Sequence, residues 1–230
     1  MPKSFIKFKP ITGNSEKHNT REIKPKYLIP GSAENLSYAD MTLKEKKEVL
    51  QKLVKEKTGR KIQAKATPIR EAVILLKDDN NEVNRLKLFE LSDRLEERFG
   101  IRAFQWHIHN DEGHIDQKGK AKYNYHAHIV FDWTNKETGK SFKLDKKDMS
   151  EIQSITAEVL KMERGIKGSK SLSLNHHQYR GFLEIKDELE KSLKIELSRE
   201  QQLKIRESIK QAQKQEYEVK RSDRTRGVSR

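Results

Sequence analysis

The residues best suited to chemistry in this chain are histidines, and five of the eight lie between positions 104 and 133. His107 and His109 are separated by a single residue, and His126 and His128 repeat that spacing. On a β-strand, side chains two residues apart leave the same face, with Cα atoms roughly 6 to 7 Å apart. Each pair therefore suits one shared cation.

Both pairs fall in segments that alternate like half-buried strands. Apolar residues occupy positions 104, 106 and 108 in the first segment and 125, 127, 129 and 131 in the second. An antiparallel pairing of the two strands would bring the histidine faces together. Three neutral imidazoles with open positions left over describe a catalytic divalent-metal site better than a closed structural one. Asp111 and Glu112, beside this site, are able to orient a ligand or move a proton.

A second interpretation of these histidines stays open, in which they are surface residues on an exposed sheet face. A lone histidine would favour that interpretation, whereas two pairs on consecutive strands favour metal binding. His114 lies in the Gly-containing connection between the strands, and it fits a solvated loop residue.

Capping residues and periodicity predict the elements that position this region. Helices are expected to start after Thr42, after Asn80 or Asn81, and after Asp145, and to end at Gly59, Gly100 and Gly165. Further strands are expected at residues 5–8 and 70–77, whereas residues 12–40 look extended or looping. This order predicts an α+β fold, in which an antiparallel sheet carries helices on one face and the site on the opposite face.

The composition is that of a basic protein, which favours a polyanion as its partner. Of the 230 residues, 33% are hydrophobic and 37% charged, with a formal net charge of +14. Nucleic acid is the expected partner, because no apolar run approaches a membrane span and no basic amphipathic helix has an aromatic face. The absence of cysteine excludes disulfide and thiolate chemistry, and it is compatible with the cytoplasm, where we place the protein.

A loop and two helices are expected in the C-terminal part of the chain. Residues 165–181 are rich in glycine and serine, and Lys167, Lys170 and Arg180 make them typical of a loop that faces DNA. A helical extension is expected at 185–221 and a basic disordered tail at 222–230. The helices are predicted at 182–197 and from 199 to about 220, the second one capped by Ser198.

Four short stretches are similar to the motifs of one known family. They are KHNTR at 17–21, IHNDE at 108–112, HAH at 126–128 and MERG at 162–165. Together they resemble a relaxase of the MobV (Mob/Pre) family, which belongs to the HUH endonuclease class and nicks DNA at a plasmid transfer origin. The resemblance covers roughly residues 1–184, which it implies to be the relaxase catalytic domain. The chain departs from the family pattern in that thirteen residues, 113–125, separate Asp-Glu from the second histidine pair, and no proline precedes that pair.

The resemblance implies a covalent mechanism. His18 is implied to attack a scissile phosphodiester in single-stranded DNA, to keep the 5′ phosphoryl group and to release a 3′ hydroxyl. Arg21 is expected to add positive charge against the negative charge that develops at the phosphate. Because most relaxases of this class are thought to use a tyrosine, Tyr27 and Tyr38 in the same N-terminal segment remain alternatives. We favour His18, which stands in the motif itself.

A divalent cation, Mn²⁺ or Mg²⁺, is the implied cofactor. The resemblance assigns it to His109, His126 and His128, and Glu112 is expected to orient or deprotonate an imidazole. The expected partners are single-stranded and duplex transfer-origin DNA, together with conjugation machinery. Two other functions are kept open: a rolling-circle replication initiator of the HUH class, and a non-catalytic basic DNA-binding module.

Overall fold

The protein divides into two compact units in the computed structural model, which describes residues 2–226 except 26, 117, 170–173 and 175. Unit 1 covers Met1–Lys167 and unit 2 covers Gly168–Arg230, an earlier division than the boundary predicted at residue 184. The helices are α1 (Ser15–Asn19), α2 (Leu43–Thr58), α3 (Asn81–Phe99) and α4 (Lys146–Leu160) in unit 1, and α5 (His176–Leu193) and α6 (Arg199–Arg226) in unit 2. The strands are β1 (Ile6–Pro10), β2 (Leu36–Ala39), β3 (Ile69–Leu75), β4 (Arg102–His109), β5 (Gly113–Ile115), β6 (Ala121–Tyr123) and β7 (His126–Asp132).

Unit 1 is built on a five-stranded sheet with the order β1-β3-β7-β4-β2. Every neighbouring pair in it is antiparallel. In the register of β4 and β7, His109 lies opposite His126 and His107 lies opposite His128. The antiparallel pairing predicted for the two histidine strands is therefore confirmed. The connection between them forms a small separate hairpin, β5–β6.

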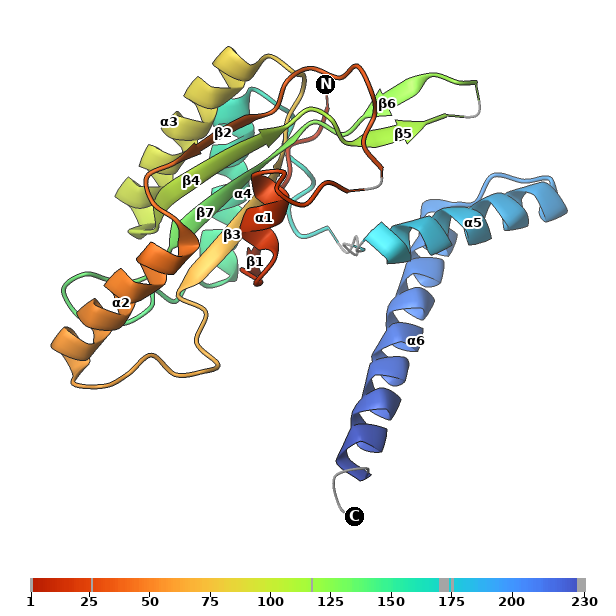
Figure 1. Cartoon of the computed structure of the whole chain (residues 1–230). Helices are drawn as coiled ribbons and strands as arrows, with labels where there is room; N and C mark the ends of the chain where they lie inside the picture. Colours follow the sequence, from red (N-terminus) through yellow and green to blue (C-terminus); the bar gives the residue numbers. More distant parts are fainter. Residues whose placement is uncertain (1, 26, 117, 170–173, 175, 227–230) are drawn as a thin grey trace. The chain divides into compact units, whose positions relative to one another are not determined.

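The two faces of the sheet have different roles because side chains alternate along each strand. Ala127, Ile129 and Phe131 of β7 pack into the main core with buried residues of α3 and α4. The intervening residues of β7 face the other way, and there Val130 packs against α2. Figure 1 shows α1 and α4 on opposite sides of the sheet. The α+β class is confirmed, but the histidine face is shared with α2, which covers its far end.

The three predicted helix starts in unit 1 are confirmed. Thr42 and Asp145 form capping boxes, and the Asn80 side chain accepts a hydrogen bond from the Val83 backbone. The end predicted for α4 at Gly165 is wrong, because the helix stops at Lys161 with φ 53°. Met162, the residue after this left-handed position, is buried in the main core.

The segment at residues 12–40 contains two elements that periodicity could not reveal. Helix α1 is five residues long and Asn14 provides no side-chain cap, so it lacks the usual signals of a helix start. Strand β2 is four residues long and pairs only with β4 at the sheet edge.

The two ends of unit 1 lie side by side. Lys3 and Glu163 form a parallel bridge, and the Ser4 backbone N–H donates to the Glu163 carbonyl at 2.7 Å. The N-terminal segment is thereby tied to the residues that follow α4.

Unit 2 is a pair of helices whose shared core includes the buried Phe182. The guanidinium carbon of Arg206 lies 4.3 Å from the centroid of the Phe182 ring. Because α5 already begins at His176, the loop predicted for 165–181 is wrong over its last residues. Helix α6 continues to Arg226, so the disordered tail predicted at 222–230 is helical over 222–226. Residues 227–230 lie outside the described part. Within that part, every helix is too short or too polar to cross a membrane.

Candidate active site

Three imidazoles from the central strands meet on one face of the sheet. His109 ends β4, and His126 and His128 begin β7. Their ring centroids are 5.1 Å apart for His109 and His126, 4.8 Å for His109 and His128, and 5.1 Å for His126 and His128. All three side chains are buried. The strand register thus brings the three predicted metal ligands to one face, although neither described group of ligand atoms within 4.8 Å of one another contains all three.

In each of these rings, one nitrogen is held by an oxygen that can only accept a hydrogen bond. His109 Nε2 donates to the Asn19 carbonyl at 2.9 Å, and His126 Nδ1 donates to the Asn124 carbonyl at 2.6 Å. His128 Nδ1 donates to Glu71 Oε1 at 2.9 Å. The proton of each neutral ring is therefore on the held nitrogen, which leaves the lone pair on the other nitrogen.

The free nitrogens are suited to a cation. His109 Nδ1 and His126 Nε2 are 3.4 Å apart, a distance that one shared ion would bridge. His128 Nε2 is buried and has no hydrogen-bond partner among the described residues. A buried nitrogen without a partner is costly unless something binds it. Metal-bound histidines usually have their other nitrogen held in this way, so the residues present fit a divalent ion.

Burial favours the neutral form of His128 and His109, as metal binding requires. It lowers the pKa of His128 to about 4, although the hydrogen bond to Glu71 opposes the shift. It also lowers the pKa of His109 well below its usual value. Burial alone would raise the pKa of Glu71, but the bonds from His128 and Lys9 outweigh it and bring that pKa to about 2. The arrangement is therefore an anionic carboxylate that accepts from a neutral imidazole.

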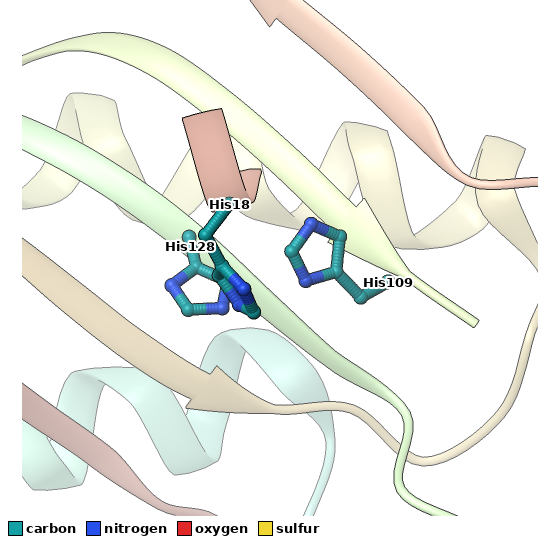
Figure 2. A group of neighbouring side chains, drawn as sticks. All are labelled: His18, His109 and His128. Atoms are coloured by element: carbon teal, nitrogen blue, oxygen red, sulfur yellow. The ribbon is translucent and has the colours of Figure 1, made fainter. Parts of the chain in front are cut away.

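His18 of α1 faces the same cluster. Its ring centroid is 5.4 Å from the centroids of His109 and His128, and its ring is packed edge-to-face with both (Figure 2). The His18 side chain is 31% exposed, whereas that of His109 is fully buried. Burial lowers the pKa of His18, against the opposing effect of Glu112. His18 is thus a neutral imidazole that remains open to solvent beside three enclosed ones.

Glu112 connects His18 with the metal-ligand candidates. Its Oε1 atom lies 3.6 Å from His18 Nε2, 3.6 Å from His109 Nδ1 and 3.8 Å from His126 Nε2. Within the described residues, two groups place possible ligand atoms within 4.8 Å of one another. One consists of His18, His109 and His128, and the other of His109, Glu112 and His126. Glu112 can therefore serve either as a ligand or as a base.

Arg21 is committed to two carboxylates. Its guanidinium donates to both oxygens of Asp111, at 3.1 and 2.5 Å, and to Glu112 at 2.8 Å. A further bond reaches the His18 carbonyl at 3.3 Å. The backbone of Arg21 has φ 62°, a conformation that costs a non-glycine residue of the order of 1 kcal/mol or more. These contacts place Arg21 between α1 and the end of β4, where it fixes Glu112.

Sequence reasoning missed two residues that hold the site together. Glu71 Oε1 accepts from the Asn19 side chain at 2.7 Å as well as from His128, and Glu71 Oε2 pairs with Lys9 at 2.8 Å. Asn19 also provides the carbonyl that holds His109. The available signal was an acidic residue inside the apolar strand β3, where an unpaired carboxylate would be costly.

The remaining predicted residues lie elsewhere. His107 is buried and bonds Ser37 at 3.0 Å, whereas His114 is exposed on the β5–β6 hairpin. Lys167 is the last residue of unit 1 and is exposed. Lys170 is outside the described residues, and Arg180 belongs to α5 in unit 2. Their contact with DNA therefore stays a prediction.

A known protein family matches the part of the chain that carries His109, His126 and His128. The family model for relaxases with a MobA/VirD2-like nuclease domain matches residues 32–165, which include His109, Glu112, His126 and His128 but not His18. No curated protein matches the chain. Two solved structures are similar, both of the MobM relaxase domain (MOBV; Mob_Pre) bound to plasmid pMV158 oriT DNA and both Mn-bound.

The MobM complex with a 22-nucleotide, 3′-thiophosphate DNA is 18% identical with a TM-score of 0.60, and the match covers 78% of this chain and 98% of that one. The MobM complex with a 23-nucleotide DNA is 17% identical with a TM-score of 0.57, and the match covers 79% of this chain and 98% of that one. The fold is thus the one the MobV resemblance implied. The chain belongs to the family of relaxases with a MobA/VirD2-like nuclease domain.

Proposed function

We propose that this protein nicks one DNA strand at the transfer origin of a plasmid or other mobile element, in the cytoplasm, by transesterification to His18. The observation that carries the proposal is the position of His18. It is the partly exposed imidazole of a four-histidine cluster, and Glu112 lies beside it. A nucleophile must be reachable by a polymer, and the other three rings are enclosed.

The reaction balances with groups present in the cluster. A neutral His18 nitrogen attacks the phosphorus, a nitrogen–phosphorus bond forms, and the bond from phosphorus to the 3′ oxygen breaks. The oxygen leaves as a 3′ hydroxyl after taking a proton from solvent, and the 5′ phosphoryl group stays on the imidazole. The imidazole proton passes to Glu112, which is 3.6 Å from His18 Nε2. Arg21 orients the carboxylate for this transfer through its 2.8 Å bond.

His109, His126 and His128 are the proposed ligands of a divalent ion, Mn²⁺ or Mg²⁺. When bound, such an ion supplies Lewis-acid stabilisation of the phosphate oxygens. The two similar MobM domains are Mn-bound, which supports manganese as the first ion to test. Glu71 and the two backbone carbonyls hold the three rings in the required orientation.

The two tyrosine alternatives are weaker candidates. Tyr38 on β2 packs its ring against Phe89 and Trp106, with centroids 5.9 and 5.5 Å away. It is paired with Trp106 in the strand register, and successive residues of a strand leave opposite faces. Tyr38 therefore lies on the helix-covered face, away from the histidines. Tyr27 is 40% exposed in the segment after α1 and stays the tyrosine to exclude by experiment.

The proposed partners are single-stranded and duplex transfer-origin DNA, and the conjugation machinery that receives the nicked strand. Both MobM domains are bound to oriT DNA, which supports this substrate class. The net charge of +14 supports a polyanion.

The test is nicking of a supercoiled plasmid that carries the cognate origin, with and without Mn²⁺. We expect nicked circles with a protein-bound 5′ end when Mn²⁺ is present, and none with His18→Ala. Nicking only of a plasmid that carries a replication origin would assign the protein to the rolling-circle initiators. Absence of any nicking would leave a DNA-binding module.

A further inference from the structure

A strongly basic groove opens at the end of the sheet away from the histidines. It has a volume of about 1050 Å³ and lies between the segment that joins α2 to β3 and the turn after β7. Seven of its lining residues are cations, and no acidic residue lines it. They are Lys57, Arg60, Lys61, Lys65, Arg70, Lys140 and Lys143. We call this feature the basic groove.

The positive charge of the basic groove is little compensated by the protein. Among the ion pairs of the described residues, only one involves a groove cation, that of Lys57 with Glu56. The stretch from 57 to 70 contains five basic residues and no acidic one. By contrast, Arg94 and Arg98 on α3 both pair with glutamates of α4. Cations gathered without counter-charges create a field that attracts a polyanion.

We propose that the basic groove binds the phosphate backbone of duplex DNA next to the nick site, an inference that rests on the proposed function. Duplex is favoured over single strand by the character of the lining. Single-strand sites combine positive charge with exposed aromatic rings on which bases stack. Phe142 is the aromatic residue lining the groove, and its ring lies against Gly100, where an added Cβ would approach it to 2.5 Å. Phe142 is half-buried there, so the lining offers no more than one partly exposed ring for stacking.

The position of the basic groove relative to the histidines indicates how bound DNA would run along the sheet. His128 is near the start of β7, and Thr134, just beyond the end of β7, lines the groove. Six residues of extended chain separate them, roughly 20 Å at 3.3 Å per residue. That length corresponds to about six base-pair steps at 3.4 Å each. A duplex in the groove would end roughly 20 Å from the cluster, and the strand to be cut would continue along the histidine face.

The test measures how binding depends on salt. The groove variant is Lys61→Gln with Lys65→Gln and Lys143→Gln, and the matched control is Lys44→Gln with Lys52→Gln and Lys77→Gln, all exposed positions of unit 1. Fluorescence anisotropy is recorded from 50 to 200 mM salt with a labelled 20-base-pair duplex and with a 20-nucleotide single strand. Each lost phosphate contact lowers the slope of log K against log salt by about 0.9, so the groove variant should lose roughly 2.7 on duplex.

The expected result is that loss on duplex for the groove variant, little change on the single strand, and wild-type slopes for the control. A duplex slope equal to wild type, an equal loss on both DNAs, or an equal loss in the control would overturn the proposal. Thermal melting confirms that each variant is folded. Adduct formation by wild-type protein on a short single-stranded origin oligonucleotide tests the proposed function separately, because that substrate has no duplex to fill the groove.

Discussion

Glu71→Gln tests whether a buried carboxylate sets the metal affinity of the site. The Glu71 side chain is almost fully enclosed and accepts from Asn19, His128 and Lys9. Glutamine keeps its shape but removes the charge and one acceptor. The lost charge-assisted bonds should lower the free energy of unfolding by about 1.5 to 3 kcal/mol. That range is consistent with the lowering of the Glu71 pKa from 4.5 to about 2, a shift that corresponds to about 3 kcal/mol of stabilisation of the charged carboxylate.

The effect on metal binding follows from the same contact. His128 Nδ1 would lose its anionic acceptor, so the ring would be a weaker and less fixed ligand. Removing such a supporting group typically costs 10- to 100-fold in metal affinity, or about 1.4 to 2.7 kcal/mol. Isothermal titration with Mn²⁺ measures this directly. Nicking at saturating Mn²⁺ should recover much of the wild-type rate, because no reacting group is removed.

A matched control separates this effect from a general loss of charge. Glu97→Gln removes an exposed carboxylate of α3 and should leave Mn²⁺ affinity and melting unchanged. Wild-type Mn²⁺ affinity in a folded Glu71→Gln protein would refute the reasoning, because His128 would then need no anionic partner. Loss of rate that saturating Mn²⁺ does not restore would also contradict it and give Glu71 a direct catalytic role.

Three further predictions concern the histidines. The covalent adduct should be acid-labile and alkali-stable, as a phosphorus–nitrogen bond is, and an adduct that persists in His18→Ala but disappears in Tyr27→Phe would transfer the nucleophile to the tyrosine. His126→Ala should abolish nicking while duplex binding, which depends on lysines and arginines, stays near wild type in a filter-binding assay; full nicking would exclude His126 as a ligand. In EDTA, the free energy of unfolding measured in urea should be greatest above pH 6.5 and fall by up to roughly 3 kcal/mol towards pH 4. The reason is that the pKa of His128 is about 4 in the folded protein and about 6.5 in the unfolded chain. A free energy of unfolding that does not change with pH would contradict the burial of His128 as a neutral ring.

The sequence was sufficient to predict the parts of the site that depend on the two-residue alternation of side chains along strands and on helix-capping residues. The spacing of His126 and His128 placed them on one face, and the antiparallel pairing with the strand of His109 followed from their order. Local signals were lacking for α1, so the proximity of His18 to the cluster came only from the motif resemblance. The clamp made by Glu71 and Asn19 joins residues 52 positions apart, and no local pattern encodes such a contact.

The C-terminal region shows a different limit of sequence reasoning. Glycine and serine near residue 170 suggested a long loop, yet packing of Phe182 in unit 2 accompanies a helix that begins at His176. Gly181 lies within that helix, where its entropic cost is about 1 kcal/mol, less than burial of a phenylalanine contributes. Tertiary burial therefore overrides the loop propensity.

The bridge between Lys3 and Glu163 makes unit 1 a candidate for circular permutation. Since the two ends of its chain are neighbours, a short linker could join them, and new ends could be opened at the exposed residues 77–79 between β3 and α3. The permuted unit would keep the sheet order while freeing both former ends from any attached sequence. A permuted nickase of this kind could be fused through its new ends at residues 77–79 to a chosen DNA-targeting module without extending the segment that carries His18.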